Sequence, residues 1–68
     1  MSIQKFTTRN GNLYMVDWDN RIYVKNKEYP EPFVRVTEIV AGFHVLISPD
    51  EFGAEMIMTD HVTEVWNV

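Results

Sequence analysis

Turn-forming residues interrupt this chain so often that no segment shows a helical period longer than one turn. Asn10-Gly11 and Asp19-Asn20 are dipeptides that accept positive φ, which two-residue hairpin turns require. They bracket residues 13–18, which are rich in apolar side chains, and the second leads into residues 21–25. We therefore predict a meander of three strands, at about residues 3–9, 12–18 and 21–26.

A segment with two prolines separates this meander from the rest of the chain. Pro30 and Pro32 cannot donate hydrogen bonds to a ladder, so we expect residues 26–32 to form a loop that breaks the sheet. After the loop, β-branched residues and alternating apolar residues predict four more strands. Ala41-Gly42 supplies the turn of a hairpin between the first two of them. These strands are expected at residues 33–40, 43–48, 54–59 and 62–68.

The elements together predict an all-β fold in a single domain over residues 1–68. Ser48-Pro49-Asp50-Glu51 has the pattern of a capping box, which predicts one helical turn near residues 48–52. About seven short strands imply either a small barrel or two tightly packed antiparallel sheets. The order of the later strands, over residues 33–40, 43–48, 54–59 and 62–67, resembles the second half of Sm-like and SH3-like barrels. This resemblance implies a small barrel and identifies no functional residue.

The chain is short for an independent domain, with 68 residues, no cysteine and two histidines far apart in sequence. A core of this size rarely supplies more than roughly 3–5 kcal/mol, and no disulfide or evident zinc site adds to it. Three segments, around residues 13–16, 45–47 and 56–58, are apolar on both strand faces. Such a strand is either central between two layers or covered by another chain, so we expect a homo-oligomer. The interface is expected to contain Met15, Met56 or Met58.

Charge is divided unevenly along the chain. Residues 1–27 carry five basic and two acidic side chains, whereas residues 28–68 carry one base, Arg35, and eight acids. The two parts have charges of +3 and −7, which gives the net charge of −4. We therefore expect a non-enzymatic module that binds a basic surface of a protein partner, as small viral accessory or inhibitory proteins bind a host factor. The expected partner-binding residues are Glu28, Glu31, Glu38, Asp50 and Glu51.

An alternative function depends on the basic part of the chain. Bases and nucleotides stack on aromatic rings beside cationic groups, so the meander is the alternative site for a nucleic acid or a nucleotide ligand. The net charge of −4 repels a phosphate backbone at long range, however, and aromatic residues on adjacent strands often form core pairs. Protein recognition therefore remains the first expectation. The alternative site consists of Tyr14, Trp18, Tyr23, Arg21 and Lys25.

Enzymatic chemistry has little support in the sequence. There is no cysteine nucleophile, and the three glycines are isolated turn residues rather than a phosphate-binding loop. His44, Asp60 and His61 suggest a metal site only if the fold brings them together, and an exposed turn histidine is the simpler interpretation. We therefore expect no catalytic site, no metal and no cofactor. No apolar run is long enough for a signal peptide or a membrane span, so we also expect a cytoplasmic protein without a membrane partner.

Overall fold

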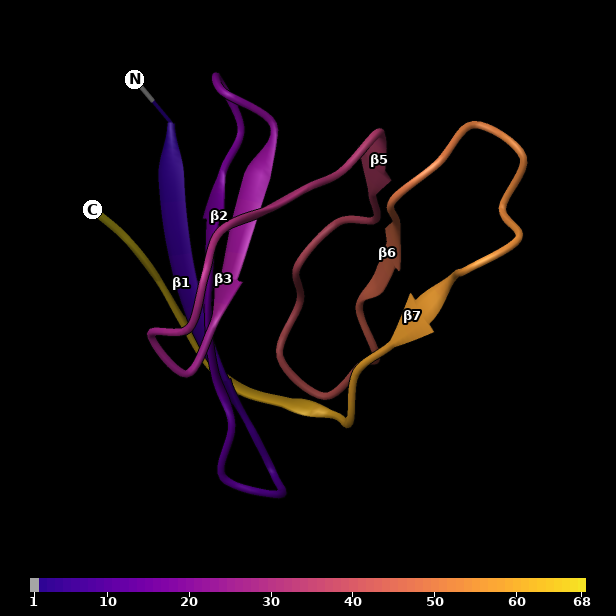
Figure 1. Cartoon of the computed structure of the whole chain (residues 1–68). Coiled ribbons are helices and arrows are strands. Elements are labelled where there is room, and N and C mark those ends of the chain that lie inside the picture. Colours follow the sequence, from indigo (N-terminus) through magenta and orange to yellow (C-terminus); the bar gives the residue numbers. More distant parts are fainter. Residues whose placement is uncertain (1) are drawn as a thin grey trace.

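Two antiparallel sheets make up the computed structural model, which describes residues 2–68 (Figure 1). The larger sheet has the strand order β4-β3-β2-β1-β8, and the smaller sheet has the order β5-β6-β7. The predicted all-β class and the two-sheet alternative are confirmed, whereas the described residues form no closed barrel and no helix. The strands are β1 (Ile3–Thr8), β2 (Leu13–Asp17), β3 (Ile22–Lys25), β4 (Glu31–Pro32), β5 (Arg35–Val36), β6 (Leu46–Ser48), β7 (Ile57–Met58) and β8 (Val62–Asn67).

The predicted meander is confirmed as β1, β2 and β3, although its strands are shorter than predicted. The connection from β2 to β3 takes four residues rather than two, because the side chain of Asp17 organises it. One carboxylate oxygen of Asp17 accepts hydrogen bonds from the backbone N–H groups of Asp19 and Asn20, both at 3.1 Å. The side-chain amide of Asn20, at 2.9 Å, and then these backbone bonds lower the pKa of the Asp17 carboxyl.

The segment predicted as a loop, residues 26–32, is a loop over residues 26–30, but its last two residues add a strand to the sheet, so the prediction that it breaks the sheet is wrong. The chain reverses at Asn26 and Lys27, whose φ angles are 52° and 60°, and then pairs with β3 as β4. The backbone N–H of Phe33 donates to the carbonyl of Arg21 at 2.9 Å. Successive residues of a strand direct their backbone groups to opposite sides, so the backbone nitrogen of Pro32 points away from β3. Proline is tolerated there because its nitrogen points away from the partner strand.

The second half of the chain contains less strand than the sequence predicts. β5 and β6 pair as the predicted hairpin, but residues 37–45 form a loop that turns at Gly42, where φ is 91°. Within this loop Ile39 is buried in the core. The helical turn predicted near residues 48–52 is wrong, because these residues form the end of β6, bends and a turn. Ser48 stays in β6 as a buried residue and does not cap a helix.

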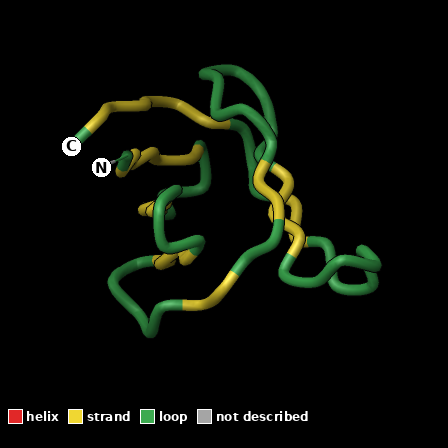
Figure 2. Tube along the Cα trace, turned by 90° about the horizontal axis from the view of Figure 1, so that it is seen from above, coloured by secondary structure: helices red, strands yellow, loops and turns green. Residues whose placement is uncertain are grey.

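Backbone hydrogen bonds connect the two sheets at two corners of the fold. At the first corner Phe33 bonds to the larger sheet, while the N–H of Val34 donates to β6 at 2.8 Å. At the second corner Val62 accepts a backbone hydrogen bond from Gly42 at 2.8 Å and donates one to Phe43 at 3.0 Å. Further along, β8 has a partner strand on one side only, which is β1 (Figure 2). The last strand therefore does not close a barrel.

The core lies between the two sheets. Phe6 and Tyr14 are cross-strand partners whose rings stack almost in parallel, with centroids 4.9 Å apart. Trp18 packs edge-on against Phe33, with ring centroids 5.9 Å apart. Within residues 2–68 there is no helix long and apolar enough to cross a membrane. The buried apolar residues are Phe6, Tyr14, Val16, Tyr23, Phe33, Val36, Ile39, Val45, Ile47 and Val62.

Candidate functional site

The outer face of the smaller sheet carries an apolar groove. Val45 and Ile47 are fully buried, so Leu46 between them points outward, opposite Met58 of β7. The groove has a volume of about 540 Å³. We call it the small-sheet groove, and it is lined by Thr37, Glu38, Val40, Phe43, His44, Leu46 and Met58.

Backbone hydrogen bonds fix the position of the apolar groups in the groove. A backbone bond from the N–H of Phe43 to the carbonyl of Val40 closes their turn at 3.2 Å, and the bond from Val62 ties Phe43 to β8. Even so, Phe43 is 65% exposed and Met58 is 64% exposed. Large apolar side chains on a fixed backbone release ordered water when another surface covers them, so this groove is suited to binding.

The connection from β6 to β7 projects away from the larger sheet (Figure 1). It carries another exposed aromatic ring, that of Phe52. A carboxylate oxygen of Asp50 accepts hydrogen bonds from the backbone N–H groups of Phe52 at 3.1 Å and of Ala54 at 3.2 Å. The loop is thus ordered by a carboxylate rather than by a helical turn. Phe52 is 93% exposed, and Glu51 and Glu55 lie close to it in sequence.

The structure divides the five predicted partner-binding acids between two parts of the molecule. Glu38 lines the small-sheet groove, and Asp50 and Glu51 lie on the β6–β7 loop of the same sheet. Glu28 lies in the turn between β3 and β4, and Glu31 is the first residue of β4; Figure 1 shows this turn on the side of the molecule away from the smaller sheet. There they line a separate hollow of about 230 Å³. Three of the five acids therefore belong to the sheet that carries the groove.

The aromatic rings of the alternative site do not form a surface platform, which corrects that prediction. Tyr14 and Tyr23 are only 4% and 8% exposed and belong to the core, so neither offers a ring face to a base. Burial raises the pKa of both phenols. Trp18 is half-buried against the core. The Arg21 guanidinium donates to a backbone carbonyl before β5 at 2.9 Å, and Lys25 is exposed.

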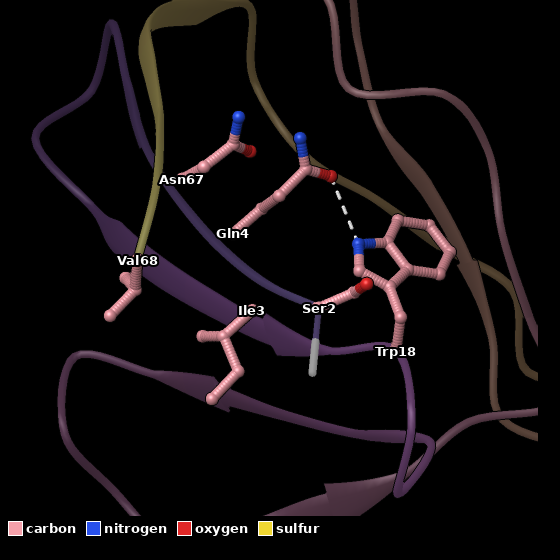
Figure 3. A pocket seen from close by; sticks show the side chains of 6 residues that line it. All are labelled: Ser2, Ile3, Gln4, Trp18, Asn67 and Val68. Atoms are coloured by element: carbon pink, nitrogen blue, oxygen red, sulfur yellow. Dashed lines mark hydrogen bonds between the residues drawn. The ribbon is translucent and has the colours of Figure 1, made fainter.

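Trp18 forms part of a cleft where β1 lies beside the end of β8 (Figure 3). Its indole N–H donates to the side-chain oxygen of Gln4 at 2.9 Å. Gln4 is in turn the cross-strand partner of Asn67. Part of the polar wall of this cleft is therefore already used within the protein. The cleft has a volume of about 450 Å³ and is lined by Ser2, Ile3, Gln4, Trp18, Asn67 and Val68.

The fold brings the rings of His44 and His61 into a tilted contact, and Asp60 beside His61 forms an ion pair with Arg9. The two imidazole centroids lie 4.2 Å apart, and the Nδ1 of His44 donates to the carbonyl of Thr59 at 2.6 Å. Asp60 accepts a hydrogen bond from the backbone N–H of His61 at 2.7 Å and pairs with Arg9 at 2.9 Å, which lowers the pKa of its carboxyl. Among residues 2–68, no group of three or more His, Cys, Asp or Glu side chains is arranged to hold a metal ion.

The doubly apolar strand at residues 13–16 keeps one face uncovered. Leu13 and Met15 point to the outer face of the larger sheet and are half-buried, while the residues between and after them point into the core. On the outer face Met15 lies between Lys5 of β1 and Val24 of β3. Within the described chain this face has no second layer, so apolar surface is available to a partner.

Sequence reasoning omits Phe43 and Phe52 from the site, although they are its most exposed aromatic residues. Each stands beside a turn glycine, Gly42 or Gly53, that has a positive φ. A large apolar side chain next to a turn glycine has no regular strand position to direct it inward. A phenylalanine next to a turn glycine is therefore the sequence pattern that indicates an exposed ring at these two positions.

Large exposed apolar side chains are thus concentrated on the smaller sheet and the β6–β7 loop, both of which lie in the acidic part of the chain, residues 28–68. We use the name small-sheet surface for the small-sheet groove together with Phe52 and Met56 of the β6–β7 loop. Comparisons of the chain with protein-family models, with curated proteins and with solved structures find no match.

Proposed function

We propose that the protein is a non-enzymatic binding module that recognises another protein through its small-sheet surface. The proposal is carried by one observation, the exposure of large apolar side chains in a groove and on a projecting loop. Aromatic residues and methionine are enriched at protein interfaces, and a few such anchors supply most of the binding free energy. The anchors proposed here are Phe43, Phe52, Met56 and Met58.

The charge around these anchors favours a basic partner. Residues 28–68 contain eight acids and one base. Glu38 lines the groove, and Asp50, Glu51 and Glu55 lie on the loop. Carboxylates at the rim of an interface act mainly on the association rate and on the choice of partner. We therefore propose a protein partner whose apolar side chains are flanked by lysine or arginine, and whose basic surface is blocked when the module covers it.

Phe43→Ala should weaken binding of the partner by about 2 kcal/mol, or roughly 30-fold, because it removes an anchor from the groove. Protein captured from a lysate by the wild-type chain is purified, and its dissociation constant is then measured by calorimetry for each variant. Tyr29→Ala is the matched control, since Tyr29 is 88% exposed on the β3–β4 turn, away from the groove. A partner that lost affinity for the Tyr29 variant but not for the Phe43 variant would place the interface elsewhere.

Charge reversal on the smaller sheet should slow association. Glu38→Lys or Glu51→Lys is expected to reduce the association rate about tenfold at low salt and to flatten its salt dependence. Lys25→Glu, on the larger sheet, should have little effect. Stopped-flow measurements at two salt concentrations test this. The opposite pattern would assign the contact to the basic meander, and a rate unaffected by every reversal would leave recognition to apolar contacts alone.

A further inference from the structure

The two outer edges of the larger sheet are β4 and β8, and prolines occur only at the β4 edge. At the β4 edge the N–H of Phe33 donates to the carbonyl of Arg21 before β3, so the backbone nitrogen of the preceding residue, Pro32, points away from β3. Proline has no N–H to offer to a further strand, and a second proline, Pro30, lies just before β4. Natural proteins block exposed sheet edges in this way to prevent pairing with another chain.

The opposite edge is β8, and its sequence contains no residue that blocks pairing with another strand in this way. The N–H of Val68 donates to the carbonyl of Ile3 at 2.9 Å, so the alternate residues Val65 and Asn67 direct their backbone groups away from β1. β8 has no proline, lysine or arginine, and its single charged residue is Glu64. In Figure 2 the part of β8 nearest the C-terminus runs along the outside of the trace. Val65 and Asn67 thus leave their N–H and C=O groups open to a further strand.

We propose that β8 pairs antiparallel with β8 of a second copy of the chain, so that the two larger sheets join across a two-fold axis. Val65 of each copy exchanges backbone hydrogen bonds with Asn67 of the other copy. The two Trp66 residues face each other at the axis, in a non-hydrogen-bonded pair, where the side chains of antiparallel strands lie closest. This is strand addition with a second copy as the donor of the strand.

Several features of β8 favour a second copy over a different protein. Trp66 and Val68 are 40% and 70% exposed on the same face of the strand, and pairing in this register covers both. Glu64 then faces Val68 of the other copy, so no like charges oppose each other. A domain of 68 residues buries a smaller fraction of its surface by itself than a larger domain does, and a shared sheet increases that fraction.

Dimerisation and partner recognition use different parts of the molecule. β8 is an edge of the larger sheet, whereas the small-sheet surface lies on the outer face of the other sheet. Each copy in the dimer therefore keeps its own small-sheet surface. The dimer does not depend on the proposed function, and either can be lost while the other remains.

Sedimentation equilibrium of the wild type, Asn67→Pro and Asn67→Ala tests the proposal. Proline at position 67 removes an N–H that faces the second copy and leaves the bonds between β8 and β1 in place. Wild type and Asn67→Ala should have twice the chain mass of 8.0 kDa, and Asn67→Pro should have the mass of one chain. A wild type that remains at 8.0 kDa at high micromolar concentration overturns the proposal, as does Asn67→Pro with the dimer mass.

A cross-linking experiment decides the question even if Asn67→Pro does not fold. The chain has no cysteine, so Trp66→Cys introduces a single thiol at the proposed axis. Mild oxidation should convert Trp66→Cys to a covalent dimer. Glu51→Cys, a matched thiol on the exposed β6–β7 loop, should stay largely uncross-linked. Cross-linking of Glu51→Cys that is as fast as that of Trp66→Cys overturns the proposed interface.

Discussion

Removal of residues 62–68 is expected to leave the chain without a cooperative unfolding transition. The deletion takes away the buried Val62 and the partly buried Val65, and it exposes the edge of β1, where Phe6 lies. It also breaks the hydrogen bond from Gly42 to Val62 that ties the two sheets at one corner. Burying one valine contributes about 1.5–3 kcal/mol, against roughly 3–5 kcal/mol from a core of this size. The shortened chain should therefore have no net stability.

Circular dichroism during thermal denaturation measures this outcome. Glu64→Ala is the control for a change within the same strand, because Glu64 is exposed and its loss should alter stability by about 0.5 kcal/mol or less. Asn67→Pro separates the loss of β8 from the loss of the dimer, because it keeps the strand and removes one of its outward donors. If the shortened chain still melts cooperatively, the rest of the core is sufficient and the expectation is wrong.

The meander was predictable because its signals are local. Asn10-Gly11 requires a reversal, and the strands on either side alternate between core and surface, as the register confirms. Asp19-Asn20 marks the position of the second reversal correctly. Like the first connection, over residues 9–12, this loop has four residues rather than the predicted two. The difference comes from Asp17, whose carboxylate binds the backbone of the turn and so ends β2 before Trp18.

The later elements were less predictable because they depend on residues far away in the sequence. Pro32 is compatible with a strand only where its nitrogen faces away from the partner, and the bond between Phe33 and Arg21 decides this. Ile39 has the β-branched side chain that is typical of a strand, but it lies in a loop and is buried in the core. Ser48 matches a helix cap, yet cross-strand pairing with Arg35 keeps it in β6. Tertiary packing overrides local propensity at each of these positions.

For the candidate site, charge was predictable from the sequence and shape was not. The excess of acids in residues 28–68 is visible directly, but only the fold shows that the β3–β4 turn carries Glu28 and Glu31 away from the groove. The same holds for the aromatic residues of the meander. Tyr14 and Tyr23 lie on adjacent strands in either interpretation, and only their place in the packed sheets assigns them to the core rather than to a binding platform.

Replacing Phe6 with alanine is the second change for which we expect loss of the fold. Phe6 is fully buried and stacks on Tyr14, with ring centroids 4.9 Å apart. Removing a core phenylalanine costs about 3–5 kcal/mol, which matches the whole stability of roughly 3–5 kcal/mol available to a core of this size. Chemical denaturation should therefore find Phe6→Ala largely unfolded without denaturant. Phe6→Leu keeps more of the apolar volume and should stay folded, with a loss of about 1.5 kcal/mol.

Phe43→Ala is the control that separates an effect on folding from an effect on recognition. It makes the same phenylalanine-to-alanine change as Phe6→Ala, but at an exposed position instead of in the core. Phe43 is 65% exposed, so its loss should change the free energy of unfolding by about 0.5 kcal/mol or less while it weakens partner binding. A Phe6→Ala protein as stable as the wild type would mean that the stack on Tyr14 is not central to the core. A Phe43→Ala protein that unfolds would make Phe43 a structural residue, and the groove would then lose the anchor on which its proposed role depends.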